Sequence, residues 1–184
     1  MLSFKGFRDV ETLVLLSNGS VTVVSMSEQK YGIGDDRVAL RIRRFEKSDL
    51  QSLYELLSDE EVMRYIEPPF TLEKTRGFLE NAGLTDDPLI YAVEDEYGIF
   101  IGYVIYHDYD NDSKEIGWIL SKRFWGKGFA QALTEILVQK TKADGKSAVI
   151  ECSPEQEATK HIAEKLEFRY AGLIDGCDVY KLDL

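Results

Sequence analysis

Apolar residues recur at every second position in several short stretches of the chain, which is the period of a β-strand with one buried face. In residues 38–45, for example, Leu40 and Ile42 alternate with Arg41 and Arg43. The same pattern predicts further strands at residues 89–94, 99–107, 114–120 and 147–152, and two last strands on either side of a turn at residues 175–178.

Other stretches carry apolar residues three and four positions apart, which is the period of an amphipathic helix. This pattern predicts helices from Thr71 to Leu79 and over residues 129–140, and a last helix that ends near Leu166. Capping boxes predict where three of the helices begin, at Ser48 with Gln51, Ser58 with Glu61, and Ser153 with Gln156.

The first 37 residues differ from the rest of the chain. Residues 11–16 and 20–24 are β-prone, and a Ser-Asn-Gly turn at residues 17–19 joins them, so we expect a β-hairpin. A turn at residues 32–36 then predicts a linker. The expected organisation is an N-terminal extension at 1–37 and a single domain at 38–184. The extension either adds a hairpin to the sheet edge or forms a dimer contact, so a monomer and a homodimer both remain open.

The order of the predicted elements is strand, helices, three strands, helix, strand, helix and two strands. Its consecutive early strands lack the crossover helices that a doubly wound parallel sheet needs. We therefore predict an α+β fold, an α/β sandwich in which helices flank a mixed, mainly antiparallel and twisted central sheet.

The composition indicates an ordinary globular domain and excludes several classes of function. The chain has 184 residues, of which 44% are hydrophobic and 30% charged. Its formal net charge of -11 argues against general nucleic-acid binding and favours cationic ligands. There is no apolar run long enough for a membrane span, no signal-peptide pattern and no cysteine framework, so we expect a cytoplasmic protein that binds no membrane.

A basic cluster on this acidic chain lies between a predicted strand and a predicted helix. Lys122, Arg123 and Lys127 crowd a turn that also contains Gly126 and Gly128. The first amides of a helix are unpaired donors at the positive end of its dipole, so a phosphate group is the ligand expected there. The spacing matches neither a P-loop nor a dinucleotide-binding fingerprint. We expect the turn to bind a pyrophosphate.

Residues 115–130 read EIGWILSKRFWGKGFA, and within them Arg123-x-x-Gly126-x-Gly128 resembles the acyl-CoA-binding signature of the GNAT superfamily of N-acetyltransferases. The stretch looks most like the branch that acetylates the N-termini of ribosomal proteins (RimJ/RimL-like). Residues 40–49 and 154–168 are similar to other motifs of that branch, so the resemblance covers residues 38–184. It implies a GNAT-like fold and an enzyme that transfers an acetyl group from acetyl-CoA to a primary amine by direct attack in a ternary complex.

The resemblance also implies where acetyl-CoA binds. In this family the pantetheine arm lies along the strand before the turn, and the amides of the turn hold the pyrophosphate. The implied cofactor site consists of Trp118, Ile119, Leu120, Arg123, Phe124, Trp125, Gly126, Lys127, Gly128, Phe129 and Ala130, with Gln156 and Thr159 from the last helical segment.

Three positions depart from the family's pattern. Gln156 stands where the branch has Asn, Glu167 where it has Gly, and Ala163 where many members have a Tyr general acid. Gln156 is equally well explained as a member of the capping box. These departures leave a non-catalytic CoA-binding or regulatory module open as an alternative. A nucleotide-phosphate site that does not bind CoA is a third interpretation.

For the base that deprotonates the amine, the family's layout points first to Glu115, with His107 as the second candidate. Thr159 is expected to assist the departing thiolate, and a backbone N–H near Ile119 or Leu120 to polarise the thioester carbonyl. An acidic loop at residues 108–112 lacks the Glu that closes a calcium-binding loop, so no metal is expected.

The acceptor is the least constrained part of the prediction. In this family the first helices and their connection form a wall of the acceptor site, here around Glu67, Pro68 and Phe70. The acidic character of this segment and of the whole chain favours a cation. A peptide N-terminus, a polyamine and an aminoglycoside all remain open.

Overall fold

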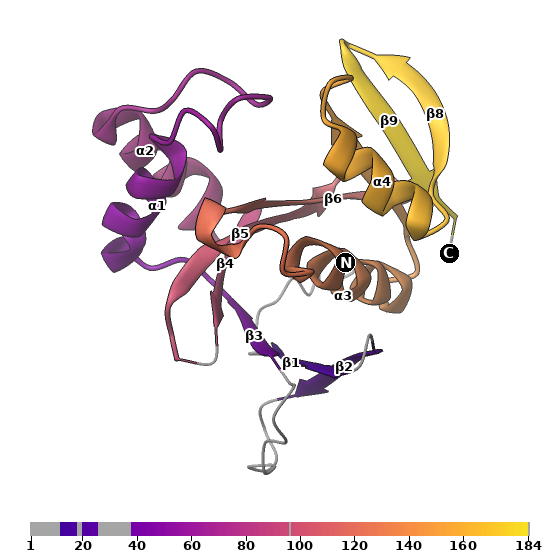
Figure 1. Cartoon of the computed structure of the whole chain (residues 1–184), viewed down its shortest axis with the longest axis horizontal. Coiled ribbons are helices and arrows are strands. Elements are labelled where there is room, and N and C mark those ends of the chain that lie inside the picture. The colour runs from indigo at the N-terminus through magenta and orange to yellow at the C-terminus, as the bar shows by residue number, and fades with distance from the viewer. Residues whose placement is uncertain (1–11, 18–19, 26–37, 96, 184) are drawn as a thin grey trace.

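The computed structural model describes residues 12–17, 20–25, 38–95 and 97–183 (Figure 1). In this part of the chain, nine strands form one sheet in the order β2-β1-β3-β4-β5-β6-β7-β9-β8. The strands are β1 (Thr12–Ser17), β2 (Ser20–Ser25), β3 (Val38–Arg43), β4 (Ile90–Asp95), β5 (Phe100–Asp108), β6 (Ser113–Leu120), β7 (Ser147–Cys152), β8 (Arg169–Ile174) and β9 (Cys177–Leu182).

The sheet is mixed and mainly antiparallel, as the sequence predicts. The β6–β7 pair is parallel, whereas the other neighbours in the described sheet are antiparallel. The helical segments are η1 (Lys47–Asp49), α1 (Leu50–Leu57), α2 (Leu72–Phe78), the π-helical η2 (Leu79–Gly83), η3 (Lys122–Phe124), α3 (Phe129–Ala143) and α4 (Glu157–Lys165).

The central strands have an apolar core on each face because their side chains alternate between the two faces. In β4, Tyr91 and Val93 belong to the core that α3 and α4 cover. Ile90 and Ala92 belong to the core that α1 and α2 cover. Figure 1 shows α1 and α2 on one side of the molecule, and α4 with the β8–β9 hairpin on the other.

The predicted N-terminal hairpin corresponds to β1 and β2, which pair antiparallel with each other. β1 also pairs with β3, so the two strands extend the edge of the sheet (Figure 1). The predicted turns at residues 17–19 and 32–36 lie partly or wholly outside the described residues. The boundary between an extension at 1–37 and a domain at 38–184 therefore stays a prediction.

The capping box predicted at Ser48 is wrong. The capping box that forms joins Glu46 and Asp49, which lie two residues earlier in the chain. Arg43 holds the Asp49 carboxylate with two nitrogens, each 2.7 Å from a carboxylate oxygen. This pair, between residues six positions apart, places Asp49 at the start of the helix, and the capping-box pattern does not contain it.

The short helix predicted after Ser58 is also wrong, because residues 59–68 form a series of turns. The Asp59 carboxylate accepts hydrogen bonds from the amides of Glu61 and Val62, at 2.9 and 3.3 Å. Side-chain bonds of this kind favour turns over a continuing helix. The following helix is as predicted: Thr71 caps α2 by accepting from the Lys74 amide.

The third predicted capping box, at Ser153, is wrong as well. The Gln156 amide donates to the Ser153 carbonyl at 2.9 Å, so these residues form a turn. α4 begins only at Glu157, and Gln156 is the residue that precedes it. The turn leaves the Gln156 side chain without a capping bond, which bears on the site described below.

A gap opens between β6 and β7. Their pairing runs only from Ser113 with Ser147 to Glu115 with Val149, although both strands continue beyond it. Beyond Glu115, the edge of β6 that faces β7 therefore carries backbone groups without a ladder partner in the described sheet. Within the described residues, no helix combines the length and apolar character that a membrane span needs.

Candidate active site

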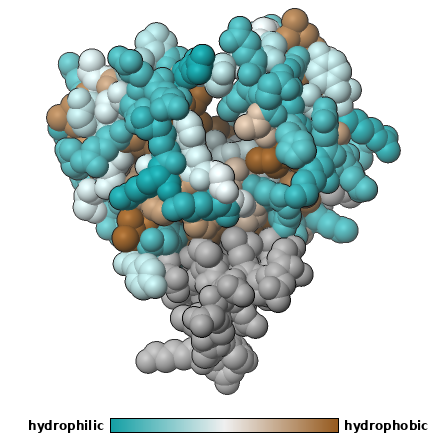
Figure 2. All heavy atoms as spheres, viewed as in Figure 1, coloured by the Kyte–Doolittle hydropathy of each residue, from teal (hydrophilic) through white to brown (hydrophobic). Residues whose placement is uncertain are grey.

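A cavity of about 660 Å³ lies where β6, the turn before α3, the start of α4 and residues 61–65 meet. We call it the large cavity. Figure 2 shows a hollow between the two upper lobes of the molecule, with apolar residues at its floor. The structure places ten residues of the predicted cofactor site around the large cavity: Trp118, Leu120, Phe124, Trp125, Gly126, Gly128, Phe129, Ala130, Gln156 and Thr159.

The turn before α3 has the backbone geometry of an anion site. Gly126 and Gly128 have φ values of 69° and 82°, the left-handed region that other residues rarely adopt. The first backbone hydrogen bond of α3 runs from the Ala132 amide to the Gly128 carbonyl, at 3.1 Å. The amides of residues 129–131 precede this bond, so they are the unpaired donors of the helix start. A Cβ built on either glycine has no neighbour within 4 Å, so the space above the turn is open.

The edge of β6 presents alternate backbone groups to the gap beside β7. Ser121 donates to the Ile101 carbonyl at 2.9 Å, which fixes which residues of β6 bond to β5. Since hydrogen-bonded pairs alternate along an antiparallel ladder, Ile119 also bonds toward β5. The amides of Trp118 and Leu120 point the other way, toward the gap. Of the two amides suggested from the sequence, only that of Leu120 has this orientation.

Aromatic residues fix the shape of the turn. Trp125 donates its indole N–H to the Leu120 carbonyl at 2.8 Å, so this carbonyl is already bonded. Phe124 and Phe129 pack edge to face, with ring centroids 5.8 Å apart, across the two ends of the turn. These contacts hold the end of β6 and the start of α3 together around the glycines.

The basic side chains of the turn are distributed differently from the predicted cluster. Lys122 forms ion pairs with Asp59 at 3.0 Å and Glu61 at 3.1 Å, on the opposite side of the large cavity. Arg123 and Lys127 lie over the Phe124 ring, and neither lines the large cavity. Backbone amides, more than these cations, are therefore the donors that the structure directs at a ligand.

The start of α4 forms the far wall of the large cavity. The Gln156 side chain makes no capping bond, so the structural role considered for it does not apply. Thr159 is buried and lines the cavity. Ala163 is fully buried in the core between α4 and the sheet, which leaves this position without a proton donor.

A second cavity of about 490 Å³, the small cavity, is formed by residues 60–69 and the β7–α4 turn. It shares Arg64, Tyr65 and Glu155 with the large cavity, so the two adjoin. The predicted acceptor residues Glu67 and Pro68 line it. Phe70, the third, lies outside both cavities, packed edge to face against Phe78 with ring centroids 5.8 Å apart.

His107 and Glu115 face each other across β5 and β6, with Nε2 and Oε2 3.3 Å apart. Burial raises the pKa of Glu115; the charge of His107 opposes this, and that of Glu151 adds to it. Neither residue lines the large cavity, since side chains at odd positions of β6 point away from the face that carries Trp118. The gap between β6 and β7 begins directly beyond Glu115, where the pairing of the two strands ends.

Sequence reasoning missed several residues that surround these cavities. Arg64 and Tyr65 line both cavities from the segment that was predicted to be helical. Glu155 lines both from the turn that was predicted to be a helix start. The sequence held a signal for the first segment, because Asp59 and the two prolines at 68–69 disfavour a helix there. Within the described residues, no group of three or more His, Cys, Asp or Glu side chains is placed to hold a metal ion.

Comparisons with known proteins agree with this geometry. The profile of the family described as "Acetyltransferase (GNAT) domain" matches residues 39–169. A curated relative, the uncharacterised N-acetyltransferase YnaD of Bacillus subtilis (strain 168), is 32% identical over 143 residues, which are 75% of this chain and 84% of that protein.

Solved structures of the same fold include a GNAT acetyltransferase from Bacillus anthracis, with 28% identity, a TM-score of 0.68 and coverage of 77% of this chain and 92% of that one. The spermidine N-acetyltransferase of Vibrio cholerae, in complex with CoA and spermine, has 22% identity and a TM-score of 0.65, covering 77% and 92%. RimL, a ribosomal L7/L12 α-N-protein acetyltransferase in complex with coenzyme A, has 18% identity and a TM-score of 0.64, covering 78% and 93%. At these identities the last two show a shared fold, so the likeness to the RimJ/RimL branch is a distant structural one. The family match and the relative show that this chain belongs to the GNAT family and is an acetyltransferase.

Proposed function

We propose that this protein transfers the acetyl group of acetyl-CoA to a primary amine of a cationic acceptor. The observation that carries the proposal is the large cavity, which runs from the open amides above Gly126 and Gly128 to the start of α4. A donor-rich helix start beside an unpaired strand edge suits a ligand with a pyrophosphate at one end and a peptide-like arm at the other.

Each part of the cofactor would meet a different element. The amides of residues 129–131 would hold the pyrophosphate, and the backbone of Trp118 and Leu120 would pair with the pantetheine arm. Gln156 and Thr159 would contact the arm from α4. The two neighbours that share the fold and were solved in complex with CoA support the assignment.

The acceptor would lie on the side of the small cavity. Glu60, Glu67 and Glu155 line this cavity with Arg64, so its carboxylates outnumber its cations. This balance and the chain's formal net charge of -11 favour a cationic amine. The two structural neighbours are a spermidine N-acetyltransferase and a ribosomal-protein α-N-acetyltransferase, so a polyamine and a protein N-terminus are both candidates, with an aminoglycoside as the third.

The chemistry requires a neutral amine, because an ammonium group has no lone pair for attack. Glu115 would take one proton from the ammonium group, which frees the amine to attack the thioester supplied by acetyl-CoA. The Leu120 amide would donate to the carbonyl oxygen as negative charge develops on it. As the C–N bond forms and the C–S bond breaks, the second amine proton goes to the thiolate, near the Thr159 hydroxyl.

Calorimetric titration with acetyl-CoA, followed by a thiol-release assay with a panel of amines, tests the proposal. Gly126→Val should abolish binding because Val strains a φ of 69° and its side chain enters the space above the turn. Gly145→Val is the matched control, since Gly145 has the same φ of 69°, lies at the other end of α3 and has no neighbour within 4 Å of its built Cβ.

The control variant should lose stability to a similar extent and still bind acetyl-CoA. Binding that survives in Gly126→Val, or that is absent in the wild type, contradicts the proposed cofactor site. Tight binding without thiol release for any amine contradicts the proposed acceptor class.

A further inference from the structure

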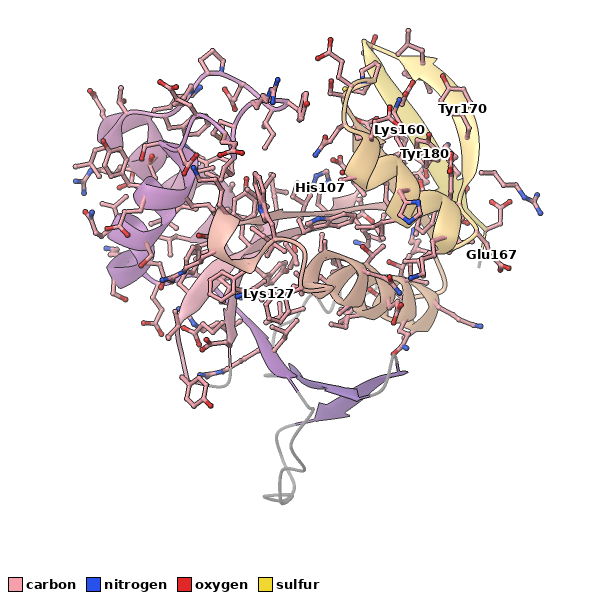
Figure 3. The ribbon with its side chains drawn as sticks, in the orientation of Figure 1. His107, Lys127, Lys160, Glu167, Tyr170 and Tyr180 are labelled. Carbon is pink, nitrogen blue, oxygen red and sulfur yellow. The ribbon has the colours of Figure 1, made fainter. Side chains whose placement is uncertain are left out.

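The contact between His107 and Glu115 fixes where their protons can lie. Figure 3 shows His107 in the middle of the molecule, between the lobe of α1 and α2 and the lobe of α4 and the β8–β9 hairpin. Its Nε2 atom lies 3.3 Å from Oε2 of Glu115. Both side chains are half-buried, which shields the contact from water.

The other ring nitrogen of His107 identifies the tautomer. Nδ1 lies 3.0 Å from the carbonyl oxygen of Asp108. A carbonyl oxygen only accepts hydrogen bonds, so Nδ1 must carry a proton and donate it. In the neutral ring, Nε2 is then the nitrogen without a proton, and it presents a lone pair to Glu115.

An ionised carboxylate also presents only lone pairs, so a neutral His107 and an ionised Glu115 would face each other as two acceptors. The contact becomes a hydrogen bond only when one additional proton lies between Nε2 and Oε2. We propose that His107 and Glu115 share this proton and act as one titrating unit, in which His107 positions Glu115 and sets its proton occupancy.

The surroundings of the pair favour retention of the proton. Burial and the charge of Glu151, on β7, both raise the pKa of Glu115. A hydrogen bond to Glu151 and burial raise the pKa of Tyr109, directly after β5, and the charge of Glu115 adds to this. Burial and the charge of Glu151 raise the pKa of Cys177 on β9, and the charge of Glu115 again adds to it. Both groups are therefore near enough to feel the charge of Glu115. With the proton bound, the unit itself is neutral.

The inference rests on the proposed function and specifies how its general base, Glu115, is controlled. With the shared proton bound, the unit cannot accept another from the ammonium group at low cost. The unit first releases its proton to water and then takes one from the acceptor, so that the resting protonation state is restored during each turnover. The second amine proton goes to the thiolate, so the unit ends the turnover with the shared proton bound, as it began.

Nitrogen NMR of the free protein tests the proton assignment without any acceptor or cofactor. The chain has two histidines, so spectra of ¹⁵N-histidine-labelled wild type and His161→Gln identify His107 by subtraction. The expected neutral form is Nδ1–H, because Nδ1 donates to the Asp108 carbonyl. A neutral Nε2–H form would overturn the proposal, because that tautomer donates to Glu115 without an additional proton.

The pH dependence of kcat/KM for the acceptor tests the role of the unit in turnover. His107→Gln keeps a donor beside Glu115 but does not titrate, so the acid limb should move to lower pH while the alkaline plateau stays near that of the wild type. The exposed His161→Gln serves as the control and should leave the profile unchanged. An unchanged acid limb with a lowered plateau in His107→Gln would show that His107 is only structural. The NMR outcome stands even when no acceptor is found, which separates this inference from the proposed function.

Discussion

Two walls of the active site are built in different ways. The cofactor wall, residues 118–130, is a strand, a glycine turn and a helix start whose function depends on backbone geometry. The acceptor wall, residues 59–70 with 153–155, is a set of turns held by side chains, above all Asp59. A backbone-built wall tolerates changes of surface side chains but not of its glycines, whereas a side-chain-built wall can change its ligand through single substitutions.

The difference suits the two ligands. One cofactor must be bound by every member of such a family, and a helix start with open amides recognises any pyrophosphate. Acceptors differ in shape and charge, so the wall that meets them carries Glu60, Arg64, Tyr65 and Glu67, none of which belongs to a regular element. Lys122 connects the two walls, because it lies in η3 and pairs with Asp59 and Glu61.

Glu115→Gln should have the largest effect on kcat and should leave both walls of the site intact. The amide cannot accept the acceptor's proton, so we expect kcat to fall about 10²–10⁴-fold, the usual contribution of a general base. The dissociation constant of acetyl-CoA, measured by calorimetry, should stay within about twofold of the wild type because uncharged Gln keeps the shape of Glu. A loss of kcat smaller than about threefold would assign the base to another group.

Gly102→Ala should disrupt the cofactor wall through a clash between β5 and β6. A Cβ at Gly102, on β5, would lie 2.0 Å from the Ile119 carbonyl oxygen, which is a backbone atom of β6 that cannot move alone. We expect a loss of about 1–3 kcal/mol in the free energy of unfolding, toward the upper end, measured by urea denaturation. Gly117→Ala is the control, because its Cβ would meet only the flexible Ile105 side chain, at 3.3 Å. Equal losses in the two variants would contradict the proposed clash.

The cofactor wall could be predicted from the sequence because its information is local. Gly126 and Gly128 stand between an alternating strand pattern and a helical one, and the structure forms the elements in that order. The strand bounds at residues 147–152 were predicted to the residue for the same reason. The sequence also suggested Gln156 and Thr159, through the resemblance, and both line the large cavity.

The acceptor wall could not be predicted because its information is long-range. Asp59 is held by Lys122, more than sixty residues away. Ser48, Ser58 and Ser153 satisfy the local rule for a helix cap, but Glu46 forms the first cap, Asp59 organises turns after Ser58, and Ser153 itself forms a turn with Gln156. The facing pair of His107 and Glu115 depends on strand register, which the turn between β5 and β6 does not specify in the sequence.

Gln156→Ala should have an intermediate effect, which is limited to cofactor binding. Because this side chain caps no helix, we expect an unchanged melting temperature and about a fivefold weaker binding of acetyl-CoA, which corresponds to one lost hydrogen bond. Thr71→Ala is the reciprocal control: its side chain does cap α2, so it should cost about 1 kcal/mol of stability with no effect on cofactor binding. A lower melting temperature in Gln156→Ala with unchanged binding would assign Gln156 a structural role instead.

Lys122→Met should have the smallest effect. It should affect acceptor binding, although Lys122 belongs to the proposed cofactor turn. Without the ion pairs to Asp59 and Glu61, residues 59–70 lose their connection to η3, so we expect the KM of the acceptor to rise about two- to fivefold, the scale of exposed ion pairs. The KM of acetyl-CoA should not change, and higher salt should reduce the difference between variant and wild type because it screens the same pairs.

Lys127→Met is the matched control, since Lys127 lies in the same turn but over the Phe124 ring and away from Asp59. It should leave the KM of the acceptor unchanged. A rise in the KM of acetyl-CoA for Lys122→Met, with the acceptor unaffected, would mean that Lys122 leaves Asp59 to bind the phosphates when the cofactor arrives. In that case Lys122 would bind the pyrophosphate, as predicted from the sequence. The two walls would then be coupled, because the cofactor and Asp59 would compete for Lys122.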